Sequence, residues 1–298
     1  MENKRGKVNR TYKDRLFKLI FKEKKDLMQL YNAINNTCYD NPDEIEVNTM
    51  EDVVYMGMKN DVSFLIKDVL NLYEHQSTYS PNLPLRGLFY FADLYRKMTE
   101  GDRDIYSSRQ IQLPFLQFVV FYSGMKEEPE RQILYLHEAF SKKNGWGKAA
   151  LDCRAIILNI NLGHNKKIMQ KCRKLEEYAI FIGKIREYTN QKMAIETAVD
   201  RAVDECIEAG ILEDILRKNR EEVCSMLLTE YNEQHHIESE REIAKEEGIK
   251  EGLREGQEQE QCRLRTLIAK MTEAGETDKL TCLADPDFLQ DMFRKYHL

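Results

Sequence analysis

Two short apolar segments, residues 59–66 and 70–76, constrain the fold more than any other part of the chain. Both are rich in Val, Ile, Leu, Phe and Tyr, and a polar pair at 67–68 separates them, so the sequence predicts a β-hairpin. The hairpin carries Asp61 near the start of its first strand and Glu74 near the end of its second. Because those two ends are neighbours in an antiparallel pair, we expect the two carboxylates to converge.

The two-residue period of a strand places Glu74 and Gln76 on one face and His75 on the other. Carboxylate and amide oxygens are the hard ligands that Mg²⁺ or Mn²⁺ prefers. The hairpin therefore predicts a divalent-metal site with Asp61 and Glu74 as ligands. A purely structural interpretation stays open, in which Asp61 caps a turn and Glu74 faces solvent.

Apolar runs and helical periodicity predict the elements on either side of the hairpin. In chain order they are a helix near residues 14–35, a strand at 53–58, the hairpin, a helix at 84–95 and a strand at 115–122 that ends before Ser123-Gly124. We therefore expect an α/β fold in which a helix, three strands, a helix and a strand follow one another.

This order is that of the PD-(D/E)XK nuclease core, and the chain more closely resembles the recombination-promoting nuclease (Rpn) family, whose members are also called PD-(D/E)XK nuclease family transposases. The resemblance covers roughly the first half of the chain. It rests on five segments in matching order, namely DRLFK at 14–18, KNDVSF at 59–64, YEHQS at 73–77, LRG at 85–87 and FVVFYSG at 118–124. It implies a restriction-endonuclease-like α/β core followed by an α-helical C-terminal region. It also implies a metal-dependent DNA endonuclease that hydrolyses phosphodiester bonds in DNA recombination, mobile-element movement or defence.

The resemblance assigns the catalytic positions. Asp61 would match the family's metal-binding Asp and Glu74 the acid of its E-x-K element, with Mg²⁺, or Mn²⁺ or Ca²⁺ in its place, as the cofactor. Gln76 stands where the superfamily usually has Lys, and the resemblance suggests that the Rpn-like branch carries Gln there. Because Gln offers the attacking water only a neutral dipole, an alternative function is a catalytically weak or inactive nuclease-fold protein that binds DNA or regulates.

Three more residues are candidates for contacts with the substrate or the metal. Lys59 lies two residues before Asp61 on the same side of its strand, and it is either a partial substitute for the missing lysine or an ordinary strand-edge lysine. Arg86 begins the next helix, where it either binds a phosphate or is an exposed arginine. Asp14 is either a further carboxylate or the first residue of a helix.

The net charge of the chain limits the kind of partner that it can bind. The formal net charge of −6 argues against a protein that coats nucleic acid indiscriminately. Residues 1–25, however, hold ten basic and three acidic residues, a net charge of +7. This segment is either a contact with the DNA backbone or a solubilising tail.

The second half of the chain is helical in pattern. From residue 149 glycine and proline become sparse, and we expect helices near 165–182, 191–209 and 211–231. The expected organisation is a nuclease-like domain at 1–148, a helical domain at 149–235, a charged glycine-repeat helix or linker at 236–262, and a small helical tail at 263–298. The helical domain either caps the core or reads DNA.

Gly248, Gly252 and Gly256 repeat every four residues and would lie on nearly one stripe of a helix. The segment is either solvated or a helix that depends on a partner, so a homo-oligomer through the C-terminal helices is an expected partner alongside DNA. No apolar run approaches the roughly 18 residues that a membrane span needs. Seven cysteines without C-x-x-C spacing fit reduced thiols. We therefore expect a cytoplasmic protein with no membrane partner.

Overall fold

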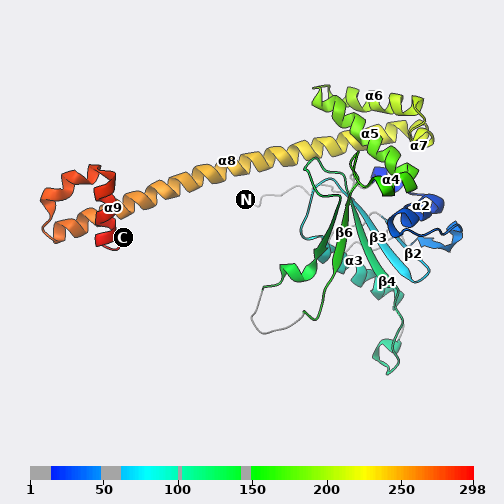
Figure 1. The fold of residues 1–298 in the computed structure, drawn as a ribbon, viewed down its shortest axis with the longest axis horizontal. Coiled ribbons are helices and arrows are strands. Elements are labelled where there is room, and N and C mark those ends of the chain that lie inside the picture. Colours follow the sequence, from blue (N-terminus) through cyan, green and yellow to red (C-terminus); the bar gives the residue numbers. More distant parts are fainter. Residues whose placement is uncertain (1–14, 48–61, 100–102, 142–148) are drawn as a thin grey trace, which may run out of the picture. The chain divides into compact units, whose positions relative to one another are not determined.

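The computed structural model describes residues 15–47, 62–99, 103–141 and 149–298. The chain divides into two compact units, residues 1–231 and 232–298. The described part of the first unit is an α/β fold with a mixed six-stranded sheet (Figure 1). The α/β class is therefore confirmed.

The sheet joins antiparallel and parallel pairs. Its strands are β1 (Ile45–Val47), β2 (Val62–Ile66), β3 (Val69–Gln76), β4 (Phe115–Tyr122), β5 (Arg131–Tyr135) and β6 (Arg154–Asn159), in the spatial order β1-β2-β3-β4-β6-β5. The pairs β3/β4 and β4/β6 are parallel, and the other three pairs are antiparallel. The carboxyl ends of β3, β4 and β6 consequently meet at one edge of the sheet.

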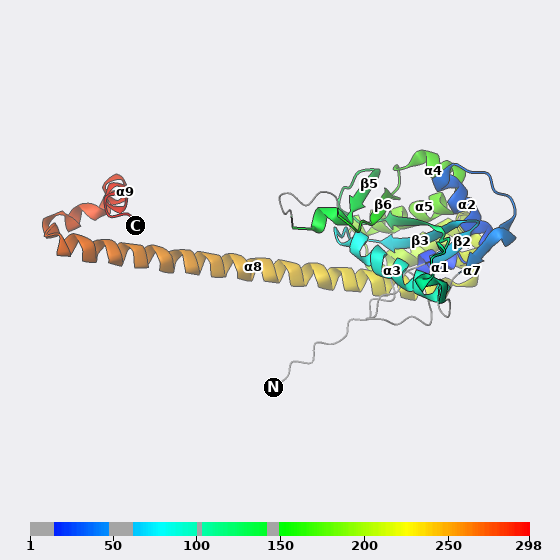
Figure 2. The ribbon, with the colours of Figure 1, turned by 90° about the horizontal axis from the view of Figure 1, so that it is seen from below.

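Helices cover both faces of this sheet. The helices of the first unit are α1 (Arg15–Ile20), α2 (Lys24–Asn35), α3 (Leu83–Met98), α4 (Lys166–Lys171), α5 (Arg173–Asn190), α6 (Ile195–Glu208) and α7 (Glu213–Lys218), with short 3₁₀ turns at Pro42–Glu44, Arg103–Tyr106 and Leu136–Ala139. The helix α3 lies on one face of the sheet (Figure 2), where it buries Tyr90 and Phe91 against Leu72 and Phe118. On the other face, the remaining helices share a second core with strand residues such as Tyr73.

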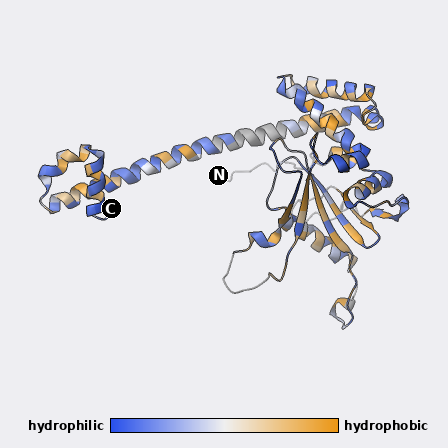
Figure 3. Ribbon diagram, viewed as in Figure 1, coloured by the Kyte–Doolittle hydropathy of each residue, from blue (hydrophilic) through white to orange (hydrophobic). Residues whose placement is uncertain are grey.

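The predicted hairpin is present as β2 and β3, with its turn at Lys67-Asp68. Lys67 has a φ of 51°, the left-handed conformation that tight turns need. Val62 pairs with Tyr73 in the register. The strand β3 is buried along nearly its whole length because helices cover both faces. Figure 3 shows that hydrophobic residues are frequent in the strands of this sheet.

Residues 154–159 differ from the helical pattern expected after residue 149, because they form β6 in the middle of the parallel part of the sheet. Their apolar run is short, and such a run fits a strand covered on both faces as well as a buried helix. The edge strands β1 and β5 were not expected either. Three residues form β1, and β5 begins with the polar pair Arg131-Gln132, so neither gives a strong strand pattern. The strand expected at 53–58 lies outside the described residues.

Three helical predictions differ from the structure. The helix expected near 14–35 is two helices, because Glu23 has an extended backbone conformation and is the N-cap of α2. The helix expected near 165–182 is also two helices, α4 and α5, and α5 continues past Gly183 to Asn190. The helix expected near 211–231 is α7 followed by a second helix that begins at Arg220. A glycine inside a helix costs only about 1 kcal/mol relative to alanine, and the buried residues on either side of Gly183 outweigh it.

The second unit consists of helices. The helix α8 (Arg220–Glu273) begins in the first unit and continues into the second, where the 3₁₀ segment η4 (Thr277–Ala284) and α9 (Pro286–Lys295) follow it. Asp285 caps α9 by accepting from the amide of Asp287 at 2.9 Å. Lys295 Nζ contacts the carboxylate of Glu276 at 2.8 Å and ties α9 to the chain before it. Helices that are both long enough and apolar enough to cross a membrane do not occur in the part of the chain that is described.

Candidate functional site

Glu74 and Gln76 lie at the carboxyl end of β3, on the face that α3 covers. The Gln76 amide donates from Nε2 to Glu74 Oε1 at 2.6 Å. The prediction that the two side chains share a face is therefore confirmed. Glu74 is only 2% exposed, so the structural alternative of a solvent-facing glutamate is wrong. A buried carboxylate at the end of a central strand is a costly feature that needs charged or polar partners.

Arg86 supplies one such partner. Its Nη2 contacts Glu74 Oε1 in an ion pair, and the arginine side chain is 33% exposed whereas that of Glu74 is 3% exposed. Arg86 lies in the first turn of α3, as expected, but its guanidinium faces the carboxylate rather than solvent alone. One oxygen of Glu74, Oε1, thus accepts hydrogen bonds from both the Gln76 amide and the positively charged Arg86 guanidinium.

Gly87 explains how α3 brings Arg86 so close to the sheet. A Cβ at this position would lie 2.6 and 2.8 Å from ring carbons of Phe118 on β4. Such distances are too short for carbon atoms, so the helix can approach the strand this closely only because residue 87 has no side chain. The sequence Leu85-Arg86-Gly87 therefore combines a charge with the residue that allows it to reach Glu74.

The other predicted site residues, Asp61, Lys59 and Asp14, lie outside the described residues. Val62, which follows Asp61 in the chain, pairs with Tyr73, which precedes Glu74. Within the described ranges, a group of three or more His, Cys, Asp or Glu side chains that could hold a metal ion does not occur. What the described residues offer a cation here is the Glu74 carboxylate and the Gln76 amide.

His75 points to the opposite face, as the strand period predicts, and forms a buried polar network there. Its Nε2 lies 2.8 Å from Ser123 Oγ and 2.8 Å from Tyr178 OH. The imidazole also stacks on Phe17 with ring centroids 5.6 Å apart. The network links β3 to the end of β4 and to α5. Its partners come from distant parts of the chain, so sequence reasoning gave no indication of it.

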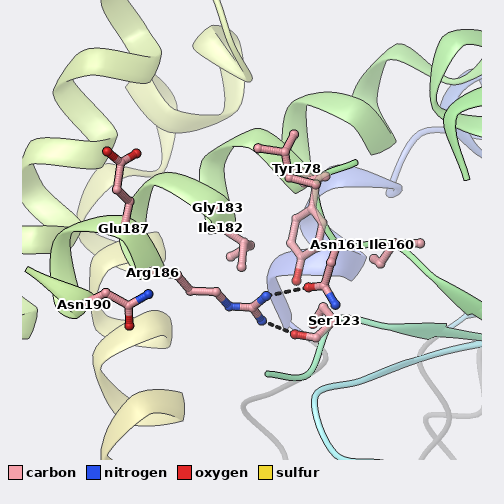
Figure 4. A pocket seen from close by; sticks show the side chains of 11 residues that line it. Ser123, Ile160, Asn161, Tyr178, Ile182, Gly183, Arg186, Glu187 and Asn190 are labelled. Carbon is pink, nitrogen blue, oxygen red and sulfur yellow. Dashed lines mark hydrogen bonds between the residues drawn. The ribbon is translucent and has the colours of Figure 1, made fainter. Parts of the chain in front are cut away.

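A pocket of about 370 Å³ lies beside this network, between α5 and the residues that follow β4 and β6 (Figure 4). Arg186 reaches across it from α5 and donates to the backbone oxygen of Ser123 and to Asn161 Oδ1. Asn161 in turn donates to the backbone oxygen of Gly124 at 3.0 Å. The sequence analysis did not predict this pocket. Arg186 gave no indication of it, because an arginine within a helical pattern is usually a surface residue.

Cysteine chemistry is disfavoured at three buried or half-buried positions. Burial raises the pKa of Cys172 to about 12, and the pKa values of Cys153 and Cys206 to about 11. These thiols stay protonated near neutral pH, whereas a nucleophilic cysteine must be a thiolate. The three cysteines therefore serve packing.

Comparisons of the chain with protein-family models, with curated proteins and with solved structures give no match.

Proposed function

We propose that the protein is a divalent-metal-dependent endodeoxyribonuclease with a PD-(D/E)XK core. The observation that carries the proposal is the buried Glu74 carboxylate, bonded to Gln76 and Arg86 at the edge where three parallel strands end. Open α/β sheets place their ligands at the carboxyl ends of strands. A carboxylate, an amide and a guanidinium at such an edge suit a site for a cation and a phosphate.

The topology gives further support. The helices α1 and α2, the antiparallel hairpin β2/β3, the helix α3 and the parallel strand β4 follow in the order expected of this core. The helix α3 connects β3 to β4 and packs on one face of the sheet. This order agrees with the resemblance stated above, which assigns Glu74 to the metal.

Under this proposal Asp61 and Glu74 hold Mg²⁺, or Mn²⁺ or Ca²⁺ in its place. Their oxygens are the ligands that such hard cations prefer. The bound ion would lower the pKa of a water molecule and neutralise charge on the scissile phosphate. Gln76 orients the water or the phosphate through its amide, while Arg86 and Lys59 bind phosphate oxygens.

A second function is favoured by a specific contact. Glu74 Oε1 already accepts from both Gln76 and Arg86, as in an ion pair that stabilises a fold. With Gln in place of the superfamily lysine, this contact supports a nuclease-fold protein that binds DNA or regulates without efficient cleavage. The two functions differ in whether Glu74 is needed for the chemistry or only for the fold.

DNA is the proposed partner in both cases, and a second copy of the chain, bound through the C-terminal helices, is proposed as another. We also propose a cytoplasmic location. Sedimentation with and without DNA tests the oligomer. Particles that contain a single copy of the chain under both conditions would contradict it.

Cleavage of supercoiled plasmid DNA tests the enzymatic proposal. The wild type is compared with Asp61→Ala and Glu74→Ala in Mg²⁺, in Mn²⁺ and in EDTA. Metal-dependent nicking that both substitutions abolish would support the endonuclease. Absence of nicking by a folded wild type would favour the binding protein.

A further inference from the structure

We propose that Arg86 and the divalent cation compete for the Glu74 carboxylate, so that binding of the cation releases the Arg86 guanidinium toward the phosphate of the substrate. This inference rests on the proposed function, because it takes Glu74 as a metal ligand. It adds a control of the site by a residue of the same chain.

The first argument is the position of the contact. Arg86 Nη2 and Gln76 Nε2 both donate to Oε1 of Glu74. A cation coordinated by this carboxylate would come close to the guanidinium, and two positive charges a few ångströms apart repel each other. The repulsion is strong here because Glu74 is buried and water screens it poorly.

The second argument concerns which partner moves. Glu74 is held in β3, which is paired on both sides by β2 and β4. Arg86 is one third exposed and lies in the first turn of α3, so its long side chain can swing into solvent without disturbing the helix. The backbone of α3 stays fixed by the close contact of Gly87 with Phe118.

The third argument is chemical. A guanidinium binds a carboxylate and a phosphate with the same planar fork of N–H donors. Arg86 can therefore exchange one anion for the other. The exchange keeps the charge of Glu74 compensated before the metal binds and supplies a phosphate ligand afterwards.

The test is Mn²⁺ binding to the full chain, measured by electron paramagnetic resonance of the free ion. Arg86→Met removes the charge and keeps an unbranched, flexible side chain. We expect it to bind Mn²⁺ about tenfold more tightly than the wild type, which corresponds to about 1.4 kcal/mol. Plasmid cleavage by the same variant should be slower, because its phosphate ligand is lost.

Arg96→Met is the matched control, since Arg96 lies on the same helix and pairs with Asp93 at the surface. It should bind Mn²⁺ like the wild type, and Glu74→Gln should lose the site in every background. If Arg86→Met binds Mn²⁺ with unchanged or weaker affinity while binding still depends on Glu74, the competition is wrong and the metal site stands. If Glu74→Gln changes nothing, both the metal site and the competition are wrong.

A measurement on the wild type serves if Arg86→Met does not fold. The side-chain Nε–Hε resonance of Arg86, assigned with Arg86→Lys, should shift on addition of Mg²⁺ and become exchange-broadened as the guanidinium leaves Glu74. A resonance that does not change at saturating Mg²⁺ would overturn the proposal.

Discussion

Tyr178 OH lies 2.8 Å from His75 Nε2 and so connects helix α5 to the strand residue between Glu74 and Gln76. The two residues are 103 positions apart in the chain. A helix of the second half therefore packs directly behind the candidate site. This agrees with the division of the chain, in which residues 1–231 form one compact unit.

Tyr178→Phe tests the importance of this contact. The change removes one buried hydrogen bond and should lower the free energy of unfolding by about 1 kcal/mol. Urea unfolding measures the loss. Tyr106→Phe is the control, since Tyr106 is 91% exposed and its replacement should leave the midpoint unchanged. Equal midpoints for wild type and Tyr178→Phe would contradict the role assigned to the network.

Two glycines in helices should respond in opposite directions to alanine. Gly87→Ala places a Cβ against Phe118 and should destabilise the first unit by about 1–3 kcal/mol. Gly248→Ala in α8 meets no described atom within 4 Å and should stabilise the helix by about 0.5–1 kcal/mol. Calorimetry of both variants checks the signs. A stabilising Gly87→Ala would show that α3 does not depend on this close approach.

Glu205 should make the stability of the α5–α6 pair depend on pH. Hydrogen bonds from Lys184, Tyr188 and Arg201 lower the pKa of its carboxyl from the ordinary 4.5 to about 2. Because the folded-state pKa is depressed, the stabilisation is fully present above about pH 4.5 and is lost as the pH falls toward 2.

We therefore expect Glu205→Gln to be less stable than the wild type at pH 7 and to approach it in stability as the pH falls through this window. Thermal unfolding at several pH values measures the difference. A difference that stays constant from pH 7 to pH 2.5 would contradict the assignment.

Gln76 can be tested by two substitutions with different expected results. Gln76→Ala removes the donor to Glu74 Oε1, and under the proposed function it also removes a dipole that orients the water or the phosphate, so it should slow plasmid cleavage by about tenfold or more. Gln76→Lys introduces the positive charge that the PD-(D/E)XK pattern carries at this point, and under the proposed function it should keep or increase the rate. Initial rates with matched melting temperatures decide, and equal rates for wild type and Gln76→Ala would exclude a role for Gln76 in cleavage.

Much of the fold near the site follows from local sequence patterns. The helix α3 could be predicted from its helical periodicity, the strand β4 from its apolar run that ends before Ser123-Gly124, and the hairpin turn from the polar pair Lys67-Asp68. The short apolar run of β6 was ambiguous, since only its place between β4 and β5 decides that it is a strand. The edge strand β5 is short and begins with the polar pair Arg131-Gln132, so it gave still less indication.

The candidate site was predictable only in part, for a related reason. Strand period alone places Glu74 and Gln76 together and His75 apart, and the hydrogen bonds confirm it. The contact of Arg86 with Glu74 depends on how α3 docks on the sheet, and the contact of His75 with Tyr178 depends on α5. Such long-range packing leaves no local pattern in the sequence.

The most direct test of the central claim is metal-dependent DNA cleavage by Glu74→Gln beside a control at another ion-paired glutamate of low exposure. Glu177 is that control, since its carboxylate pairs with Arg173 on α5 and its side chain is 13% exposed. With Mg²⁺ or Mn²⁺, wild type and Glu177→Gln should nick supercoiled plasmid, Glu74→Gln should not, and EDTA should stop all cleavage. Nicking by a folded Glu74→Gln protein at the wild-type rate would contradict the proposal that Glu74 belongs to a catalytic metal site.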